Sequence, residues 1–258
     1  MDTDTIDSGT RDVLRVTTVE PGIAQLAIDD AERENRLSHE LVDRLMTTLP
    51  ALAADSSLKV LVVTGSDSIW CAGGTLRLLR QLATGEFDER RLLDLCDQLL
   101  DFPVPVVGAL AGHAVGGGLA LALCCDILIA AGNRRYAVNS ASMGFVPAMG
   151  LTTMLPAAVG HHFASEMIFT SKYYRGSELA GRGLFNAVVA ADEVLDRAMD
   201  TAQRIAEKPR YVLELLKDTL SLPKRHALQE ARSHEPVMNR VCFDHPEFDA
   251  TFSQTYLS

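Results

Sequence analysis

The stretch GHAVGGGLALALCCDILIAA, residues 112–131, decides how this chain can fold, because three consecutive glycines lead directly into a long apolar run. The apolar residues predict a helix followed by a buried strand. The three glycines and Asp126 interrupt the run, which argues against a membrane span. Glycine permits sharp turns and close approach of a ligand, and the first N–H groups of a helix have no acceptor inside it. Such a helix start can bind an anionic oxygen.

A second glycine-rich segment, WCAGGT at residues 70–75, has the same setting. It follows the apolar strand predicted for LKVLVVTG at residues 58–65 and precedes a predicted helix. Two helix starts that face each other would form an oxyanion hole, although the glycines would serve equally well for close packing of helix against strand. Neither segment has the G-x-G-x-x-G or G-K-[ST] pattern of nucleotide-binding loops. The sequence therefore argues against a nucleotide and leaves an oxyanion site and a purely structural role both open.

Strands and helices alternate over residues 58–150, which predicts parallel strands with crossover helices and an α/β fold. Before them, two β-branched runs within residues 13–28 are separated by a Pro-Gly turn and predict a hairpin. Leucines at helical spacing after Ser38 predict a helix with that serine as its N-cap. The last hundred residues are predicted to be mainly helical. Helix starts are expected there near Ser177, Asp192 and Pro209.

Composition narrows the possible partners. The chain has 258 residues, with 24 lysines and arginines against 34 aspartates and glutamates, so its formal charge is -10. This balance and the lack of a basic block argue against nucleic acid and anionic membrane surfaces. The five cysteines form no C-x-x-C pair and have no histidine at zinc-ligand spacing, which predicts reduced thiols and no metal site. Residues 1–12 are polar and acidic, unlike a signal peptide, and are expected to form a flexible leader of a cytoplasmic protein.

Three further stretches carry a family resemblance, namely GFVPAMG at 144–150, EMIFTSKYYRGSELAGRGL at 166–184 and KPRYVLELLK at 208–217. Together with the two glycine segments they resemble the crotonase (enoyl-CoA hydratase/isomerase) superfamily over most of the chain. The resemblance implies an α/β fold, a crotonase-like spiral of ββα repeats over residues 13–195 with a C-terminal helical trimerisation region over residues 196–258. It also implies that no cofactor is used and that the protein assembles as a homotrimer or a dimer of trimers.

The resemblance further implies how the substrate is held. A thioester carbonyl would accept hydrogen bonds from the N–H groups of Ala72 and Gly117. Gly73, which follows Ala72, and Gly116, which precedes Gly117, would line the substrate-binding site.

Two acids that this family uses for hydration are missing. Hydratases of the family manage water with two glutamates, and matching the motifs places Ala120 and Ser140 at those positions. Neither an alanine nor an unassisted serine supplies an acid or base of suitable pKa. Double-bond isomerases, which generally use the second carboxylate, are disfavoured for the same reason.

A narrower resemblance fits better. GFVPAMG, the TTMLP that follows it, and AEKPRYVLELLK resemble the decarboxylating enoyl-hydratase-like enzymes of polyketide β-branching. These enzymes convert a 3-methylglutaconyl group on an acyl carrier protein to a 3-methylcrotonyl group. Loss of CO2 leaves a dienolate whose charge flows into the thioester oxygen, so two N–H donors stabilise it and no general base is needed. We therefore predict a lyase whose substrate is an acyl thioester of a carrier protein or of CoA.

The decarboxylases that the chain resembles carry a lysine on the helix after the oxyanion segment and a histidine near the C-terminus. Here Leu76 takes the place of the lysine, and Arg80 on the same predicted helix face is the candidate that seats the carboxylate. Asn239 takes the place of the histidine, and His234 lies five residues earlier. Tyr174, near the expected mouth of the pocket, is a candidate to assist protonation.

Two other functions fit the same features. A divergent enoyl-thioester isomerase or hydratase would use a substitute acid such as Ser140 or Tyr174. A non-catalytic protein that binds acyl carriers would explain why polar groups are missing at Leu76 and Asn239. A carrier protein is acidic, so its docking would need local positive charge. The candidates for that charge are Arg77, Arg80, Arg90 and Arg91.

Overall fold

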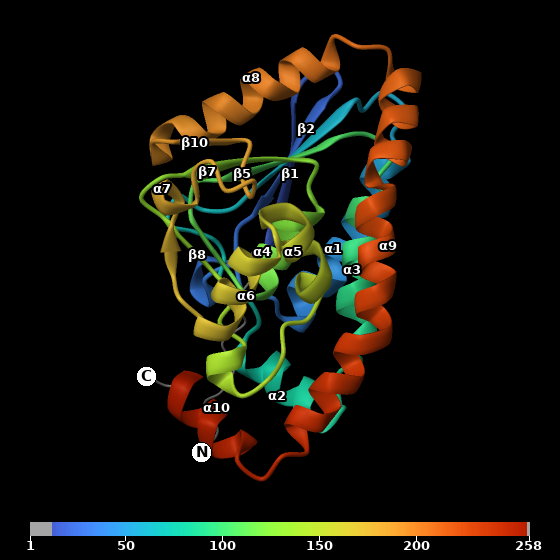
Figure 1. The fold of residues 1–258 in the computed structure, drawn as a ribbon. Coiled ribbons are helices and arrows are strands. Elements are labelled where there is room, and N and C mark those ends of the chain that lie inside the picture. The colour runs from blue at the N-terminus through green and yellow to red at the C-terminus, as the bar shows by residue number, and fades with distance from the viewer. Residues whose placement is uncertain (1–11, 257–258) are drawn as a thin grey trace, which may run out of the picture.

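The computed structural model describes residues 12–256 and contains two β-sheets surrounded by helices (Figure 1). The leader predicted for residues 1–12 lies outside the described residues, apart from Asp12. The strands are β1 (Leu14–Glu20), β2 (Ile23–Ile28), β3 (Val60–Thr64), β4 (Ile69–Cys71), β5 (Val106–Leu110), β6 (His113–Val115), β7 (Ile127–Ala131), β8 (Arg135–Ala137), β9 (Tyr174–Arg175) and β10 (Ala187–Val189). The helices are α1 (His39–Ala53), α2 (Leu76–Thr84), α3 (Arg90–Leu100), α4 (Gly117–Cys124), α5 (Leu151–Val159), α6 (His161–Thr170), α7 (Gly176–Leu179), α8 (Val194–Ala206), α9 (Arg210–Phe243) and α10 (Phe248–Tyr256), with a short 3-10 helix η2 (Ala141–Met143).

The larger sheet has the strand order β1-β2-β3-β5-β7-β10. β1 and β2 form the predicted antiparallel hairpin, and the later neighbours pair in parallel. Side chains alternate between the two faces of a strand. Along β3, Val60 and Val62 pack against α8, whereas Leu61 and Val63 face the main core. The strand is therefore apolar throughout, as expected of a parallel sheet covered on both faces.

The smaller sheet has the strand order β4-β6-β8-β9. Its first three strands each follow a strand of the larger sheet, because β4 comes after β3, β6 after β5 and β8 after β7. Each pair of strands then leads into helix: α2 follows β4, α4 follows β6, and η2 with α5 follows β8. This repetition confirms the predicted α/β spiral of ββα units.

The predicted helix starts are also confirmed. The Ser38 hydroxyl accepts a hydrogen bond from the N–H of Leu41 at 3.1 Å and caps α1. Thr75 caps α2 in the same way through the N–H of Leu78. α9 begins directly after Pro209, which cannot donate a backbone hydrogen bond and is well suited to a helix start.

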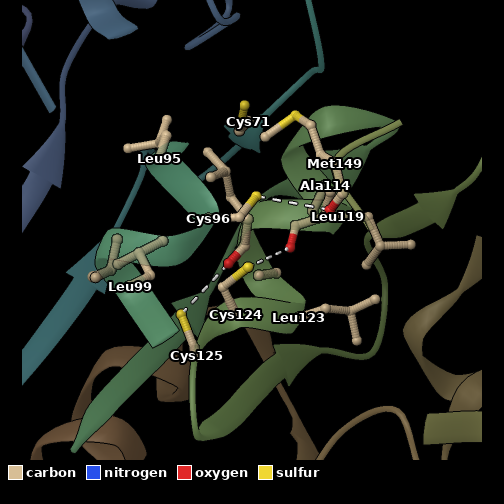
Figure 2. Close-up of a cluster of buried hydrophobic side chains, with 14 of the residues drawn as sticks. Cys71, Leu95, Cys96, Leu99, Ala114, Leu119, Leu123, Cys124, Cys125 and Met149 are labelled. Carbon is tan, nitrogen blue, oxygen red and sulfur yellow. Dashed lines mark hydrogen bonds between the residues drawn. The ribbon is translucent and has the colours of Figure 1, made fainter. Parts of the chain in front are cut away.

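Helix α4 lies in the core beneath the smaller sheet, and every residue after its first is buried. The thiols of Cys96, Cys124 and Cys125 lie in or beside this helix, and each donates a hydrogen bond to a backbone oxygen (Figure 2). Gly118 lets β4 lie directly against the helix, because a Cβ at this position would come within 2.1 Å of the backbone oxygen of Cys71. This close packing fixes the first glycine segment relative to the start of α4.

The C-terminal region is helical, as expected. α9 runs along one side of the molecule, and α10 packs against η2 near α2 (Figure 1). Exposed apolar side chains lie along α9, namely Tyr211, Leu215, Leu216, Leu220, Leu222, Val237, Met238 and Val241. Trimerisation through this region stays a prediction. Within residues 12–256, no helix combines the length and the apolar character that crossing a bilayer requires.

Candidate active site

A cavity of about 600 Å³ opens beside the two glycine segments. Its walls also come from α2, the start of α3, residues 139–151, and the C-terminal helices α9 and α10. The inner wall is mainly apolar and includes Leu37, Leu78, Leu82, Leu92, Phe145 and Phe248. This lining suits an acyl chain. Among residues 12–256, we find no group of three histidine, cysteine or acidic side chains arranged to hold a metal ion.

The two glycine segments lie side by side at this cavity. β4 and β6 are parallel neighbours, with Cys71 paired to Ala114. Gly73 has a positive φ of 86°, and a Cβ at its position would lie 3.1 Å from the oxygen of Val115 and 3.8 Å from the nitrogen of Gly117. Only glycine combines this backbone conformation with so close an approach. The predicted convergence of the two segments is therefore observed.

The second segment presents the start of a buried helix. Gly116 has φ 53° and ψ -121°, turns the chain from β6 into α4, and donates its N–H to the oxygen of Ala137 at 2.9 Å. Gly117 lines the cavity as the first residue of α4, so its N–H has no acceptor within the helix. The positive end of the helix dipole lies at the same point. This geometry suits an anionic oxygen.

The first segment differs from the expectation for Ala72. The N–H of Ala72 donates to the backbone oxygen of Glu34 over 3.4 Å. This bond is long, but it shows that the N–H is directed at the chain segment on the far side of β4 from β6. The donor that the resemblance assigned to Ala72 is thus engaged within the chain.

A neighbouring N–H in the same segment has the opposite direction. The N–H of Leu37 donates to the oxygen of Gly73 at 2.7 Å, and the N–H of Thr75 donates to the oxygen of Leu37 at 2.9 Å. These two bonds form a parallel bridge between Leu37 and Gly74. Backbone groups alternate in direction along an extended chain, so the N–H of Gly74 points away from Leu37, towards the side of Gly117.

The mouth of the cavity is polar. Arg36, Arg135 and His113 line it, together with Tyr173, which is 40% exposed and accepts a hydrogen bond from Nδ2 of Asn139 at 3.1 Å. Burial lowers the pKa of His113, and neighbouring positive charge adds to the effect. Its Nδ1 accepts the N–H of Arg135 at 2.7 Å, which also favours a neutral ring. Two arginines at an open mouth suit a phosphate group on the substrate.

Two side chains that are far apart in the sequence meet in the inner wall. Asn239 is 2% exposed, donates from Nδ2 to Oε1 of Glu89 at 3.0 Å and accepts the N–H of Val146 at 3.1 Å. Burial raises the pKa of Glu89 above its usual value, and the hydrogen bond from Asn239 opposes the rise. Asn239 was expected in the site, whereas Glu89 was not. Its place in a run of charged residues at a helix start gave no sign that it turns inward.

Ser140 also lies in the cavity wall. The residue is 4% exposed, and its hydroxyl is a buried polar group without a hydrogen-bond partner among residues 12–256. Its neighbour Asn139 lies against Gly116, since a Cβ on that glycine would come within 3.1 Å of Oδ1 of Asn139. A buried hydroxyl without a partner is costly in free energy. A ligand that hydrogen-bonds to Ser140 would remove this cost.

Two charged candidates, Arg80 and His234, lie away from the cavity. Arg80 is exposed, because the face of α2 that turns inward carries Leu78 and Leu82. His234 is exposed on α9, because Glu235 and Asn239, one turn apart, form the inward face of that helix. Neither Arg80 nor His234 is part of the cavity wall.

Tyr174 and Leu76 are also displaced from the expected positions. Tyr174 is 3% exposed and donates its hydroxyl to Oε1 of Glu166 at 2.7 Å. Burial, together with this carboxylate, raises the pKa of Tyr174 to about 12. The adjacent Tyr173 lies at the mouth instead. Leu76 packs against the cluster that includes Met143 and does not line the cavity.

Cys71 lies beside the site without the properties of a nucleophile. Burial raises the pKa of its thiol to about 11, so about one molecule in a thousand carries the thiolate at pH 8. We expect Cys71 to resist iodoacetamide at pH 8 in the folded protein, while the half-buried Cys242 reacts. Peptide mass spectrometry after timed labelling tests this, with the denatured protein as the fully labelled control. Labelling of Cys71 as fast as Cys242 would contradict the expectation.

Comparison with known proteins gives a consistent result. The family model described as enoyl-CoA hydratase/isomerase matches residues 18–255. The bacillaene synthase decarboxylase PksI of Bacillus subtilis (strain 168) is 33% identical over 249 residues, which cover 96% of this chain and 99% of that protein.

Solved structures agree with the sequence comparison. The ECH2 decarboxylase domain of CurF from Lyngbya majuscula superimposes with a TM-score of 0.87 at 32% identity, covering 95% of this chain and 100% of that one. A structure from a dehydratase/decarboxylase enzyme couple involved in polyketide β-branching superimposes with a TM-score of 0.90, also at 32% identity and with the same coverage. The narrower resemblance that the sequence motifs suggested is thereby supported.

Proposed function

The chain belongs to the enoyl-CoA hydratase/isomerase family, and from this premise we propose that it decarboxylates a 3-methylglutaconyl-type thioester carried by an acyl carrier protein. Its similarity to decarboxylases over nearly the whole length makes it an enzyme. The observation that carries the proposal is the apolar cavity at which two glycine segments converge without the two acids that hydration would need.

The missing acids argue for carbon-carbon cleavage over hydration. Ala120 is fully buried in α4 and has no side chain that could move a proton. The hydroxyl of Ser140 has no basic partner among the described residues. At these two positions a water molecule would therefore find no acid or base to activate and deliver it. Decarboxylation needs only that the developing charge be stabilised.

The thioester oxygen is where that charge is stabilised. When the bond between the terminal carboxylate and the acyl chain breaks, its electron pair is delocalised as a dienolate onto this oxygen. In our proposal the oxygen accepts hydrogen bonds from the N–H of Gly117 and the N–H of Gly74. Gly74 replaces Ala72 as the first donor, because the N–H of Ala72 is directed at Glu34. Each such donor is typically worth about 3 kcal/mol in the transition state.

The remaining polar groups fit the two ends of the substrate. The buried hydroxyl of Ser140 can donate a hydrogen bond to the leaving carboxylate, the task that the sequence assigned to Arg80. Arg36 and Arg135 at the mouth suit the phosphate of the carrier's phosphopantetheine arm. Exposed Arg77 and Arg80 on α2 supply positive charge for an acidic carrier.

The proposal is tested by incubating the purified protein with 3-methylglutaconyl-acyl carrier protein and following the intact mass of the acylated carrier. We expect the acyl group to lose the mass of CO2, and the CoA thioester of the same acid to react more slowly because it lacks the carrier surface. Crotonyl-acyl carrier protein serves as the comparison substrate. Hydration or double-bond migration of that substrate, without loss of CO2 from the first, would favour the isomerase or hydratase alternative. No product from either substrate in folded protein would favour a binding role.

A further inference from the structure

Glu89 occupies the N-cap position of α3, yet its side chain makes no capping hydrogen bond. The short side chains of serine, threonine, aspartate and asparagine are the ones that usually cap a helix from this position. Here the carboxyl group turns into the cavity wall and meets Asn239 of α9, 150 positions away in the sequence. The first N–H of α3, that of Arg90, is instead accepted by Oδ1 of Asp88 at 3.0 Å, so the Glu89 side chain is not used in capping.

Asn239 holds this carboxyl in one orientation. The N–H of Val146 can only donate, so it fixes Oδ1 of Asn239 as the atom facing it. Nδ2 is then the atom that faces Glu89, and it contacts one carboxyl oxygen, Oε1, at 3.0 Å. The second oxygen, Oε2, is the one that remains to carry a proton.

The surroundings of Glu89 favour its neutral form. Burial raises its pKa above the usual value, and the negative charges of Glu235 on α9 and of Asp88 beside it act in the same direction. The hydrogen bond from Asn239 and the charge of Arg240 oppose the rise. An acid with a raised pKa remains protonated at a higher pH than an exposed glutamate does.

Other proton donors in the wall are less suitable. His113 lies at the mouth and has a lowered pKa, and Glu34 is exposed and paired with Arg36. Tyr173 and Ser140 carry hydroxyl groups, which are weak acids. Glu89 is the carboxyl group of the inner wall among the described residues, and that wall is where the far end of the acyl chain would lie.

We infer that Glu89, positioned by Asn239, is the acid that protonates the terminal carbon of the dienolate. This inference rests on the proposed function. After CO2 has left, the O–H bond of Glu89 breaks, a C–H bond forms at the terminal carbon, and the dienolate charge passes to the carboxylate. The product is the 2-enoyl thioester, and Glu89 regains its proton from solvent before the next turnover. Glu89 is thus a catalytic residue and Asn239 a positioning residue.

The kinetic test compares Glu89→Gln with the wild type and with Glu86→Gln, a matched control at an exposed neighbour. We expect Glu89→Gln to lower turnover about a hundredfold, because the dienolate must be protonated before product is released. We also expect it to release a mixture of 2-enoyl and 3-enoyl products, because solvent then protonates either carbon of the dienolate. NMR of the product measures this ratio. Equal rates and a single product in Glu89→Gln would overturn the inference.

The pH dependence separates the two residues. A rate that requires neutral Glu89 falls as pH rises through the pKa of that group, and this limb should be absent in Glu89→Gln. Asn239→Ala removes a hydrogen bond that lowers the pKa, so its limb should move to higher pH. A purely structural role for Asn239 would lower the rate without moving the limb.

A binding measurement keeps this inference distinct from the proposed function. The saturated 3-methylglutaryl-CoA cannot form the dienolate but brings a carboxylate into the same cavity. At a pH above the limb of the pH–rate profile, where Glu89 is ionised in the free enzyme, the carboxylate of the ligand favours protonation of Glu89, so calorimetry in buffers of different ionisation enthalpy should show proton uptake by the wild type and none by Glu89→Gln. If the wild type takes up a proton without losing CO2 from the unsaturated thioester, the proposed reaction fails while Glu89 still faces the acyl chain. Equal proton uptake in both proteins, or no binding to the wild type, would refute the assignment.

Discussion

Replacing Gly117 by proline is expected to lower kcat for decarboxylation by about a hundredfold to a thousandfold, the usual effect of removing one oxyanion donor. Proline has no N–H, and the first position of a helix is where it is best tolerated. Gly116 also permits it, because its φ and ψ of 53° and -121° mirror the extended conformation that residues before proline prefer. The change therefore removes one N–H at the site while the start of α4 keeps its conformation.

The matched control is Gly117→Ala, which retains the N–H. Both variants add a Cβ that would lie 2.9 Å from Leu37 Cδ1 and 3.1 Å from Met149 Sδ, so both disturb these two side chains. The ratio of their kcat values removes the effect of the shared Cβ and leaves the effect of replacing the N–H by the ring methylene of proline. Steady-state kinetics and thermal melting of each variant give the measurement. Equal kcat values for the two variants would show that the N–H of Gly117 does not stabilise the reaction.

The fold and the convergence of the glycine segments could be predicted because both depend on local sequence. A buried strand followed by glycines and an apolar helix occurs twice, and the carboxyl ends of neighbouring parallel strands meet at one edge. The hydroxyl of Ser38 caps its helix through the residue three positions on, a contact that spacing alone predicts. Such features need no knowledge of the tertiary structure.

The choice between Ala72 and Gly74 could not be made in this way. It depends on the segment at Leu37, which pairs with the first glycine segment from the side opposite β6. The motif indicates the first glycine segment, and the donor expected there, Ala72, lies two residues from Gly74. The direction of each N–H is set by this third strand-like partner, which no feature of the motif indicates.

The candidate side chains that lie away from the cavity differ from the buried ones in helix phase. Spacing in the sequence predicts one face of α2 with Leu76 and Arg80, whereas Leu78 and Leu82 are the buried pair. On α9, the inward pair is Glu235 and Asn239, which leaves His234 on the exposed face. A resemblance fixes a position to within a residue or two, but one residue on a helix changes direction by about 100°.

Glu89 could not be found from the sequence because its partner lies 150 positions away. In the sequence it belongs to a charged run that suggests a solvated helix start. The structure brings α9 across α3, and the amide of Asn239 then turns the carboxyl into the cavity. Where the resemblance leads us to expect a histidine, this chain has an amide, and that amide contacts a carboxyl group. The proposed site keeps an ionisable group in the wall although it has lost the expected one.

Asp126→Ala is expected to lower the free energy of unfolding by about 3 to 5 kcal/mol, because it strands a buried cation. The ammonium of Lys217 on α9 is 1% exposed and donates to both carboxyl oxygens of Asp126, at 3.0 and 2.8 Å, and to the oxygen of Leu99. Asp126 also accepts the N–H of Val106 at 2.7 Å, the first residue of β5. The substitution removes the countercharge and one acceptor at the edge of the sheet. Thermal melting should show a fall of about 10 °C for a chain of this size.

A double-mutant cycle with Lys217→Met separates the two causes of this loss of stability, the stranded cation and the lost backbone contact at β5. That change removes the cation and leaves Asp126, which is 22% exposed and still bonded to Val106, so we expect a cost of only about 1 kcal/mol. In the Lys217→Met background, Asp126→Ala should cost far less than it does in the wild type, because no buried cation remains to be stranded. An equal cost in both backgrounds would assign the loss to the backbone contact at β5. In that case the ion pair of Asp126 and Lys217 would hold α9 to the sheet no more strongly than a neutral contact does. Its charges would then serve only to orient α9, the helix that carries Asn239.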